Sequence, residues 1–297
     1  MNINLWNDSE IQQYHTDGAR GYRYSDSHYP SVTTLVSMLE KADFSGWEKR
    51  VGKDKAKSIR AESSLHGTTV HLAIESYLRC GGDTNKAFEM FYQNLNREWL
   101  ALKSSQLMNL GDVRAELSLL LRPFKDFLNI VSPVATEKKV FWRDRDGEVG
   151  FGGTADCFLE VADGRLQLPD GSKLPGGLVV ADWKNHRSKK EPKSFKWNKE
   201  PYYPLLRYAL QLSAYAAGFN YLTDSQYTLN QALLICASPN ATDIYYFSPE
   251  ALAWHFEMLV EGLHALKDNQ PFDWIEFEAL ADELGYLGCP VRIVDIS

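Results

Sequence analysis

The sequence lacks any long apolar run, and nothing in its 297 residues approaches the roughly 18–20 consecutive apolar residues that cross a bilayer. The first residues, MNINLWNDSEIQQ, include acids and lack the basic start of a secretory signal peptide. We therefore predict a cytoplasmic protein, from a bacterial or phage-infected cell, with no membrane partner.

Cysteines are few and scattered. The four of them are Cys80, Cys157, Cys236 and Cys289, and no two have the CxxC spacing. A zinc or iron–sulphur site therefore has little support. An even number leaves disulfides open, but buried free thiols in a reducing compartment are the favoured interpretation.

Internal repeats and low-complexity tracts are also absent, which argues against a solenoid and against a long disordered arm. Hydrophobic residues make up 44% of the chain and charged residues 24%, which are ordinary values for a globular protein. No linker forces a division into independent units. We predict one domain over 1–297, with a mainly helical part at 1–132, an α/β core at 133–270 and an acidic tail at 271–297.

Positive charge is scarce overall, since the formal net charge is −7, and this argues against a nucleic-acid partner. The distribution of charge argues the other way. Seven bases against one acid lie between Lys184 and Lys199, and seven against three lie between Lys41 and Arg60. Eleven acids against two bases follow residue 242. Attraction to a phosphate backbone depends on local positive charge. A solvated surface is the alternative explanation for each basic run.

Apolar residues at helical spacing predict helices in the first half of the chain. The segments are Ser45–Arg60, Ser64–Leu78, Thr84–Lys103 and Asp112–Ile130, with glycine stops at 81, 82 and 111. A shorter helix towards Leu39 begins after Pro30, where Ser31 can cap it. The residues before Pro30 are interpreted as irregular or as short strands.

After Pro133 the pattern changes to strands rich in Val, Phe and Leu. We predict strands at Lys139–Arg143, Thr154–Val161 and Leu178–Trp183, a helix at Pro204–Tyr221, strands at Ala232–Ala237 and Ile244–Phe247, and a helix at Pro249–Leu266. The apolar run Leu178–Ala181 is typical of a central strand buried on both faces. This order predicts an α/β fold in which helices flank a central sheet, with a helical N-terminal elaboration.

Charged residues follow the predicted central strand as Asp182-Trp183-Lys184, and a spacing of two places Asp182 and Lys184 on one face. Asp156 lies in the strand before it, after Gly152-Gly153-Thr154. Antiparallel pairing of the two strands would bring both carboxylates together, and a divalent cation relieves repulsion between close carboxylates. A plain salt bridge between Asp182 and Lys184 is the alternative.

Two further polar pairs have the i,i+4 spacing that puts both residues on one helix face. They are His71 with Glu75, preceded by Gly67, and Gln211 with Tyr215. We expect Gly67 to allow a close backbone approach. A lone helical His is more often structural than functional, and neither pair is diagnostic by itself.

The order of these motifs is more specific than any one of them. Gly-x-x-x-His-x-x-x-Glu, Gly-x-x-Asp, Asp-x-Lys and Gln-x-x-x-Tyr follow one another along the chain. Together they resemble the RecB-like branch of the PD-(D/E)XK nuclease superfamily. Within that branch, Pro30–Leu35, Gly67–His71 and Val179–Asn185 look like the mitochondrial genome maintenance exonucleases and their phage relatives, and the likeness spans Tyr29–Asn220.

The resemblance implies a restriction-endonuclease-like fold with a mixed central sheet, and a site that binds Mg²⁺ or Mn²⁺, with no iron–sulphur cluster expected. It assigns the metal to His71, Asp156, Asp182 and the Trp183 carbonyl, and catalysis to the same three side chains together with Lys184, Gln211 and Tyr215. Lys184 would orient the attacking water and stabilise developing negative charge. Whether Glu75 and Glu137 belong to the site stays open.

Contacts to the substrate are expected from two regions. Ser31, Thr33 and Thr34 could donate to a phosphate at a helix start, although simple capping explains them equally well. Lys189, Lys190, Lys193 and Trp197 lie in a linker where lysines and aromatic residues interleave. That pattern suits single-stranded DNA, and filling of a core or an interface is the equal alternative for its aromatic rings.

We therefore predict a metal-dependent exonuclease that hydrolyses DNA phosphodiester bonds and prefers single strands with a free end. One alternative is a double-strand endonuclease or end-resecting nuclease with the same site. The alternative from another class is a non-catalytic nucleic-acid-binding module with a degenerate nuclease fold.

Overall fold

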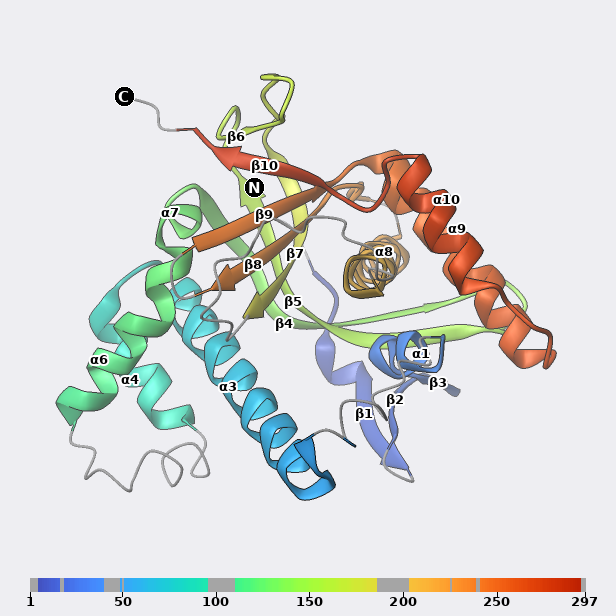
Figure 1. The fold of residues 1–297 in the computed structure, drawn as a ribbon, viewed down its shortest axis with the longest axis horizontal. Coiled ribbons are helices and arrows are strands. Elements are labelled where there is room, and N and C mark those ends of the chain that lie inside the picture. Colours follow the sequence, from blue (N-terminus) through green and yellow to red (C-terminus); the bar gives the residue numbers. More distant parts are fainter. Residues whose placement is uncertain are drawn as a thin grey trace.

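The computed structural model of the protein describes residues 5–16, 19–39, 49, 51–95, 110–185, 203–224, 226–238 and 241–294. Its centre is a seven-stranded mixed sheet with the strand order β4-β5-β7-β8-β9-β10-β6 (Figure 1). Helices flank this sheet, so the predicted α/β class is confirmed.

The middle of the sheet consists of the predicted strands with longer bounds. β4 (Val131–Arg143) pairs antiparallel with β5 (Gly150–Val161), which pairs antiparallel with β7 (Gly177–Asn185). β7 runs parallel to β8 (Ala232–Ser238), and β9 (Ala241–Phe247) returns antiparallel to β8. Parallel strands need a crossover connection, and α8 (Tyr203–Leu222) lies in the one between β7 and β8.

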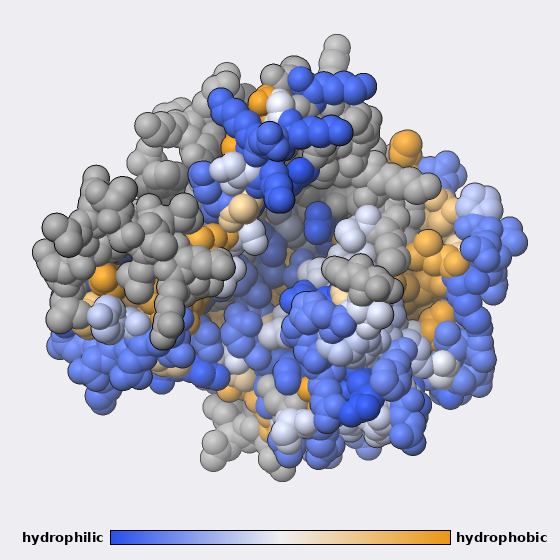
Figure 2. Space-filling view, turned by 90° about the horizontal axis from the view of Figure 1, so that it is seen from below, coloured by the Kyte–Doolittle hydropathy of each residue, from blue (hydrophilic) through white to orange (hydrophobic). Residues whose placement is uncertain are grey.

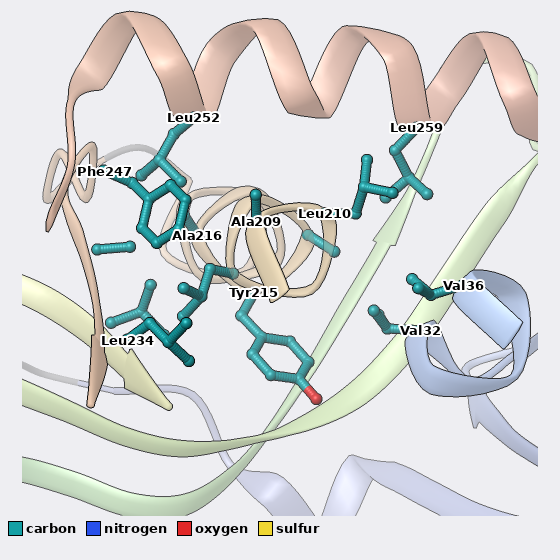
Figure 3. Close-up of a cluster of buried hydrophobic side chains, with 14 of the residues drawn as sticks. Val32, Val36, Ala209, Leu210, Tyr215, Ala216, Leu234, Phe247, Leu252 and Leu259 are labelled. Atoms are coloured by element: carbon teal, nitrogen blue, oxygen red, sulfur yellow. The ribbon is translucent and has the colours of Figure 1, made fainter. Parts of the chain in front are cut away.

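Two buried clusters cover the two faces of the sheet. On one face, side chains of α1 (Val32–Leu39), α8 and α9 (Pro249–Lys267) pack on the strands, as Figure 3 shows for Val36, Leu210 and Leu252. On the other face lie the helices between residues 53 and 128. In β8, Leu233 and Leu234 belong to opposite clusters because successive strand residues point to opposite faces.

The helix α3 (Lys53–Arg79) is continuous, whereas the sequence predicted two helices over this stretch. Gly67 lies inside it and costs a helix only about 1 kcal/mol relative to Ala. Val70, Ala73 and Ile74 are buried on its inner side. Burial of these side chains outweighs the cost of one glycine.

The other helices of this layer are shorter than predicted. α4 (Thr84–Asn94) begins at Asp83, whose carboxylate accepts hydrogen bonds from the amides of Asn85 and Lys86. α6 (Leu110–Leu121) gives way to the 3-10 helix η2 (Arg122–Phe124) and the short α7 (Lys125–Leu128). Pro123 explains this break, since proline cannot donate in a helical ladder.

The residues before Pro30 were predicted to be either irregular or short strands, and the described part of this segment forms short strands. β1 (Ile11–Thr16), β2 (Ala19–Tyr24) and β3 (Ser27–Pro30) make a separate antiparallel sheet, preceded by the 3-10 helix η1 (Asp8–Glu10). This sheet lies against β5, because Tyr22 is fully buried and its hydroxyl group is 2.9 Å from the Thr154 hydroxyl. Ser31 also bridges to Gly152 of β5.

The segment predicted as an acidic tail is part of the fold. It forms α10 (Trp274–Glu283) and β10 (Cys289–Ile293), and β10 pairs with β9 and with the two-residue strand β6 (Leu166–Gln167). Phe277, Ala281 and Leu287 are buried, so the acids of this segment lie among core-forming apolar residues.

Two expectations about the whole chain can be compared with the structure. Among the described residues, no helix is both long and apolar enough to span a membrane. The four cysteines are unpaired, as favoured from the sequence, but only Cys157 and Cys236 are buried.

Candidate active site

The Asp-Trp-Lys motif lies at the carboxyl end of β7, as predicted. β5 and β7 pair antiparallel, and the pair Cys157–Ala181 brings the neighbouring Asp156 and Asp182 to the same end of the two strands. Trp183 is 2% exposed and packs edge-on against Phe124 and Phe127. The buried indole anchors the strand end. Because successive strand residues point to opposite faces, Asp182 and Lys184 then lie on the other face of the strand.

Asp156 is held by backbone and side-chain donors from two directions. Its Oδ2 accepts a hydrogen bond of 3.0 Å from the Trp183 amide, and its Oδ1 lies 3.4 Å from Nδ1 of His71. Burial alone would raise the pKa of Asp156, but the charge and hydrogen bond of His71, together with Lys184 and the Trp183 amide, outweigh burial and lower it to about 2. Asp156 is therefore ionised throughout the neutral range.

His71 reaches this carboxylate from α3, on the other side of the strand ends. Its Nε2 lies 2.9 Å from the Trp183 carbonyl oxygen. Burial disfavours the charged ring, yet the Asp156 carboxylate prevails and raises the pKa of His71 to about 9. At neutral pH the imidazolium donates through one nitrogen to Asp156 and through the other to the carbonyl.

Asp182 and Lys184 form an ion pair, which was the alternative explanation of their spacing. Nζ of Lys184 lies 2.5 Å from Oδ2 of Asp182, whose side chain is 1% exposed. The other oxygen, Oδ1, accepts a 3.2 Å hydrogen bond from Nε2 of Gln211. Burial raises the pKa of Asp182 to about 6 against the attraction of Lys184, and Asp182 in turn raises the pKa of Lys184 against the effect of burial.

Gln211 and Tyr215 come from α8, one turn apart, as the i,i+4 spacing predicted. The Gln211 amide donates to the Tyr215 hydroxyl oxygen at 2.8 Å. Tyr215 is 1% exposed, and Figure 3 shows its ring pointing from α8 towards the strands. Burial raises the pKa of Tyr215 well above its usual value, so the hydroxyl stays neutral. This pair holds Asp182 in place from the helix side.

Glu137 enters the site from β4, and its backbone is strained there. The pairs Thr136–Cys157 and Lys138–Ala155 lie on either side of it, which places Glu137 opposite Asp156. Its φ is +48°, in the left-handed region that non-glycine residues rarely adopt. Desolvation, followed by repulsion from Asp156, raises the pKa of Glu137 to about 7. The backbone of β4 therefore leaves the extended conformation where the two acids face each other.

Three side chains converge closely enough to hold a cation. One ligand atom each from His71, Glu137 and Asp156 lie within 4.8 Å of one another. This differs from the predicted set, because Glu137 takes the place expected for Asp182, whose oxygens contact Lys184 and Gln211. Two carboxylates and an imidazole suit a hard or borderline divalent cation such as Mg²⁺ or Mn²⁺. The residues present therefore fit the implied metal.

The other predicted residues lie around this centre or outside the described chain. Glu75 pairs with Arg79 at 3.2 Å, and it acts on the site through repulsion that raises the pKa of Glu137. Ser31 caps α1 through the Thr34 amide, and Thr33 accepts a 2.7 Å hydrogen bond from Arg20, so all three hydroxyl residues have internal partners. The predicted substrate residues Lys189, Lys190, Lys193 and Trp197 lie outside the described residues.

The close backbone approach predicted at Gly67 is not found among the described residues, whereas Gly153 lies close to a side chain of α8. A Cβ atom on Gly67 would meet nothing within 4 Å among the described residues, so no described backbone segment approaches Gly67 closely. A Cβ atom on Gly153 would lie 2.6 Å from Cε1 of Tyr215. The glycine of the Gly-x-x-Asp motif is therefore needed so that α8 can pack against β5.

Sequence reasoning missed Tyr208. Its ring lies 4.9 Å from Nζ of Lys184, measured to the ring centroid. The signal was present in the sequence, because Tyr208, Gln211 and Tyr215 are spaced three and four residues apart and share one face of α8. That Tyr208 lies beside the lysine of the Asp-Trp-Lys motif can only be recognised once the packing of α8 against β7 is known.

Seen from below, the molecule is hollowed near its middle, and hydrophilic residues dominate the hollow (Figure 2). In Figure 1 the same side shows α3 and the β1–β3 sheet on either side of the carboxyl end of β7.

Comparisons with known proteins add little to this description. No protein-family model matches the chain, and neither does any curated protein. A solved structure, "Crystal structure of SSO0001", is similar over 82% of this chain and 79% of its own, with 16% identity and a TM-score of 0.34. A likeness this weak carries no argument about fold or function, and the functional argument rests on the site itself.

Proposed function

We propose that this protein is a metal-dependent deoxyribonuclease that hydrolyses phosphodiester bonds. The observation that carries the proposal is the convergence of His71, Glu137 and Asp156 beside the buried Asp182–Lys184 pair. A cluster of metal donors next to a shielded ammonium suits chemistry on a phosphate, which is anionic and becomes more so in the transition state. The motif order that resembles RecB-like nucleases supports the same proposal.

Each group has a role that its surroundings permit. A divalent cation bound by the acids and His71 would act as a Lewis acid on the phosphate. Lys184 stays charged at every relevant pH, so its ammonium can stabilise negative charge that develops on the phosphate oxygens. Gln211 holds the Asp182 carboxylate, and this carboxylate keeps the ammonium at the strand end.

An end-labelled DNA assay with Mg²⁺ and Mn²⁺ tests the proposal. We expect wild-type protein to degrade the DNA, and Asp156→Asn and Asp182→Asn to lose activity, because each removes a charge that the site needs. Asp170→Asn is the matched control, since that carboxylate accepts from Ser172 in an exposed turn. Full activity of Asp182→Asn would contradict the proposal. So would wild-type protein that is inactive both with Mg²⁺ and with Mn²⁺.

We also propose exonuclease action on single-stranded DNA, with Lys189, Lys190, Lys193 and Trp197 in contact with the strand. The basic run from Lys184 to Lys199 supports this substrate, because lysines can follow the phosphates and rings can stack on unpaired bases. A double-strand endonuclease with the same site and a non-catalytic binding module remain the rivals. The first would cut a closed circle, and the second would bind DNA without cutting it.

A further inference from the structure

Among the described residues, an acidic and an aromatic side chain lie beside the Lys184 ammonium. Among the described residues its ion-pair partner is Asp182, with 2.5 Å between the charged atoms. Its other contact is the aromatic ring of Tyr208, whose centroid lies 4.9 Å from Nζ. This distance is within the range in which the negative face of a ring attracts a cation.

Tyr208 is positioned for this contact by the helix that carries the rest of the motif. It precedes Gln211 by one turn and Tyr215 by two turns on α8. Gln211 bonds to the Asp182 carboxylate, so the same helix face reaches both members of the Asp182–Lys184 pair. Tyr208 is partly buried and also packs against the core cluster beneath α8, which restricts where its ring can lie.

An aromatic ring suits this position better than a second carboxylate would. A carboxylate would neutralise the ammonium and compete with the phosphate for it, whereas a ring attracts the cation and leaves its charge intact. A lysine side chain is also long and rotates freely, so a second contact is needed to hold Nζ in one place.

We infer that Tyr208 is a positioning residue that holds the Lys184 ammonium through the face of its ring, ready for the charge on a substrate phosphate. The catalytic part of this inference rests on the proposed nuclease function. The contact itself does not, since it follows from the positions of the two side chains alone.

Progressive fluorination of the ring tests the inference without changing its shape. Phenylalanine and its mono-, di- and trifluorinated forms at position 208 remove electron density step by step. We expect kcat to fall with each fluorine, by about tenfold over the series, which corresponds to ~1.4 kcal/mol. KM for a labelled single strand should stay within about twofold. Equal kcat values along the series would overturn the inference.

A matched control uses Tyr221 on the same helix. That tyrosine is 38% exposed and contacts Arg143 through its hydroxyl group, away from Lys184. The same fluorinated residues at position 221 should leave kcat unchanged. If they lower kcat as much as those at 208, the effect is a general one on α8, and the inference is wrong.

An NMR measurement separates the contact from the proposed activity. In protein with ¹³C-labelled lysine, the Lys184 Hε protons should be shifted upfield by the ring, with the signal assigned through Lys184→Arg. The shift should persist in Tyr208→Phe and disappear in Tyr208→Leu. If the shift is present but wild-type protein cuts no DNA, the proposed function fails and the contact stands. If DNA is cut but Tyr208→Leu leaves the lysine signal unmoved, the inference fails alone.

Discussion

At the scale of single residues, the site is a set of charges that compensate one another without a cation. His71 is protonated against Asp156, and Lys184 against Asp182. A cation that uses His71 must therefore displace a proton, because only the neutral imidazole has a lone pair to offer. Metal binding at this site would therefore be coupled to proton release.

We predict that metal affinity depends on pH in two steps. His71 has a pKa of about 9 and Glu137 a pKa of about 7, both raised, so protons compete with the metal below these values. The association constant for Mn²⁺ should rise roughly tenfold per pH unit between pH 7 and 9, and more steeply below pH 7, where two protons leave. Titration calorimetry from pH 6 to 9 measures this.

Two substitutions assign the steps. Glu137→Gln should remove the steeper rise of the Mn²⁺ association constant below pH 7 and leave the rise between pH 7 and 9. His71→Asn should remove the rise between pH 7 and 9. Asp156, with its pKa of about 2, stays ionised and adds no slope in this range. A pH profile that is identical in Glu137→Gln and wild-type protein would show that Glu137 is not a ligand.

A separate prediction concerns Lys184, whose role is with the phosphate and not with the metal. Lys184→Met should lower turnover by roughly 10²-fold, the scale seen when one preorganised donor is removed from an active site. Mn²⁺ affinity should not weaken, because the substitution removes a positive charge from beside the donors. Calorimetry that finds metal binding abolished in Lys184→Met would refute this division of roles.

At the scale of secondary-structure elements, the site depends on how α8 docks on β5. Gly153 lies directly under Tyr215, which is almost fully buried and bonded to Gln211. Any side chain at position 153 would push Tyr215 away and move Gln211 with it. The position of Asp182 is therefore determined two contacts away, by a glycine in another strand.

We predict opposite outcomes for two glycine-to-alanine substitutions. Gly153→Ala should destabilise the protein by about 1–3 kcal/mol, as overpacking does in a filled core, and should lower activity as well. Gly67→Ala lies in the interior of α3 with no described atom within 4 Å of the new Cβ, so it should stabilise by about 0.5–1 kcal/mol. Urea unfolding of both variants measures this, and equal effects would contradict the packing argument.

At the scale of the whole molecule, charge is unevenly distributed around a net charge of −7. Most of the acids after residue 242 lie in α9 and α10, and the basic run begins at the carboxyl end of β7, where the candidate site is. The proposed DNA contact would use this local positive charge in spite of the negative net charge.

The proposed DNA contacts predict a strong dependence of binding on salt. The affinity for a single strand should fall steeply as NaCl rises, because each lysine that contacts a phosphate releases counterions. Replacing Lys189, Lys190 and Lys193 with Gln should flatten this dependence while Mn²⁺ affinity is unchanged. Fluorescence anisotropy over a salt series tests it, and an unaltered slope in the triple variant would exclude these lysines from the contact.

Exonuclease action is tested by the topology of the substrate. We predict that a linear single strand is degraded and that a covalently closed circle of the same sequence is not, since a site between α3 and the β1–β3 sheet favours a strand with a free end. Gel analysis of both substrates over time distinguishes the two. Rapid cutting of the circle would establish an endonuclease instead.

Local patterns in the sequence predicted the α/β fold class, and the order of its motifs predicted most residues of the candidate site. Strand periodicity predicted β5, β7, β8 and β9, and helical spacing predicted α8 and α9 to within a few residues. These elements depend on local patterns that a reader of the sequence can see. Asp156, Asp182, Lys184, His71 and the Gln211–Tyr215 pair were selected differently, by the order of their motifs, which resembles that of RecB-like nucleases.

Which side chains of the site contact one another depends on tertiary packing and could not be predicted from local patterns. That Glu137 faces Asp156, that Gln211 and Lys184 engage both oxygens of Asp182, and that Tyr208 reaches Lys184 are contacts between elements far apart in the chain. The same holds for β6 and β10, which are short strands that pair with distant partners, and for the undivided α3. Local propensity is weak at such positions, and long-range packing determines the outcome.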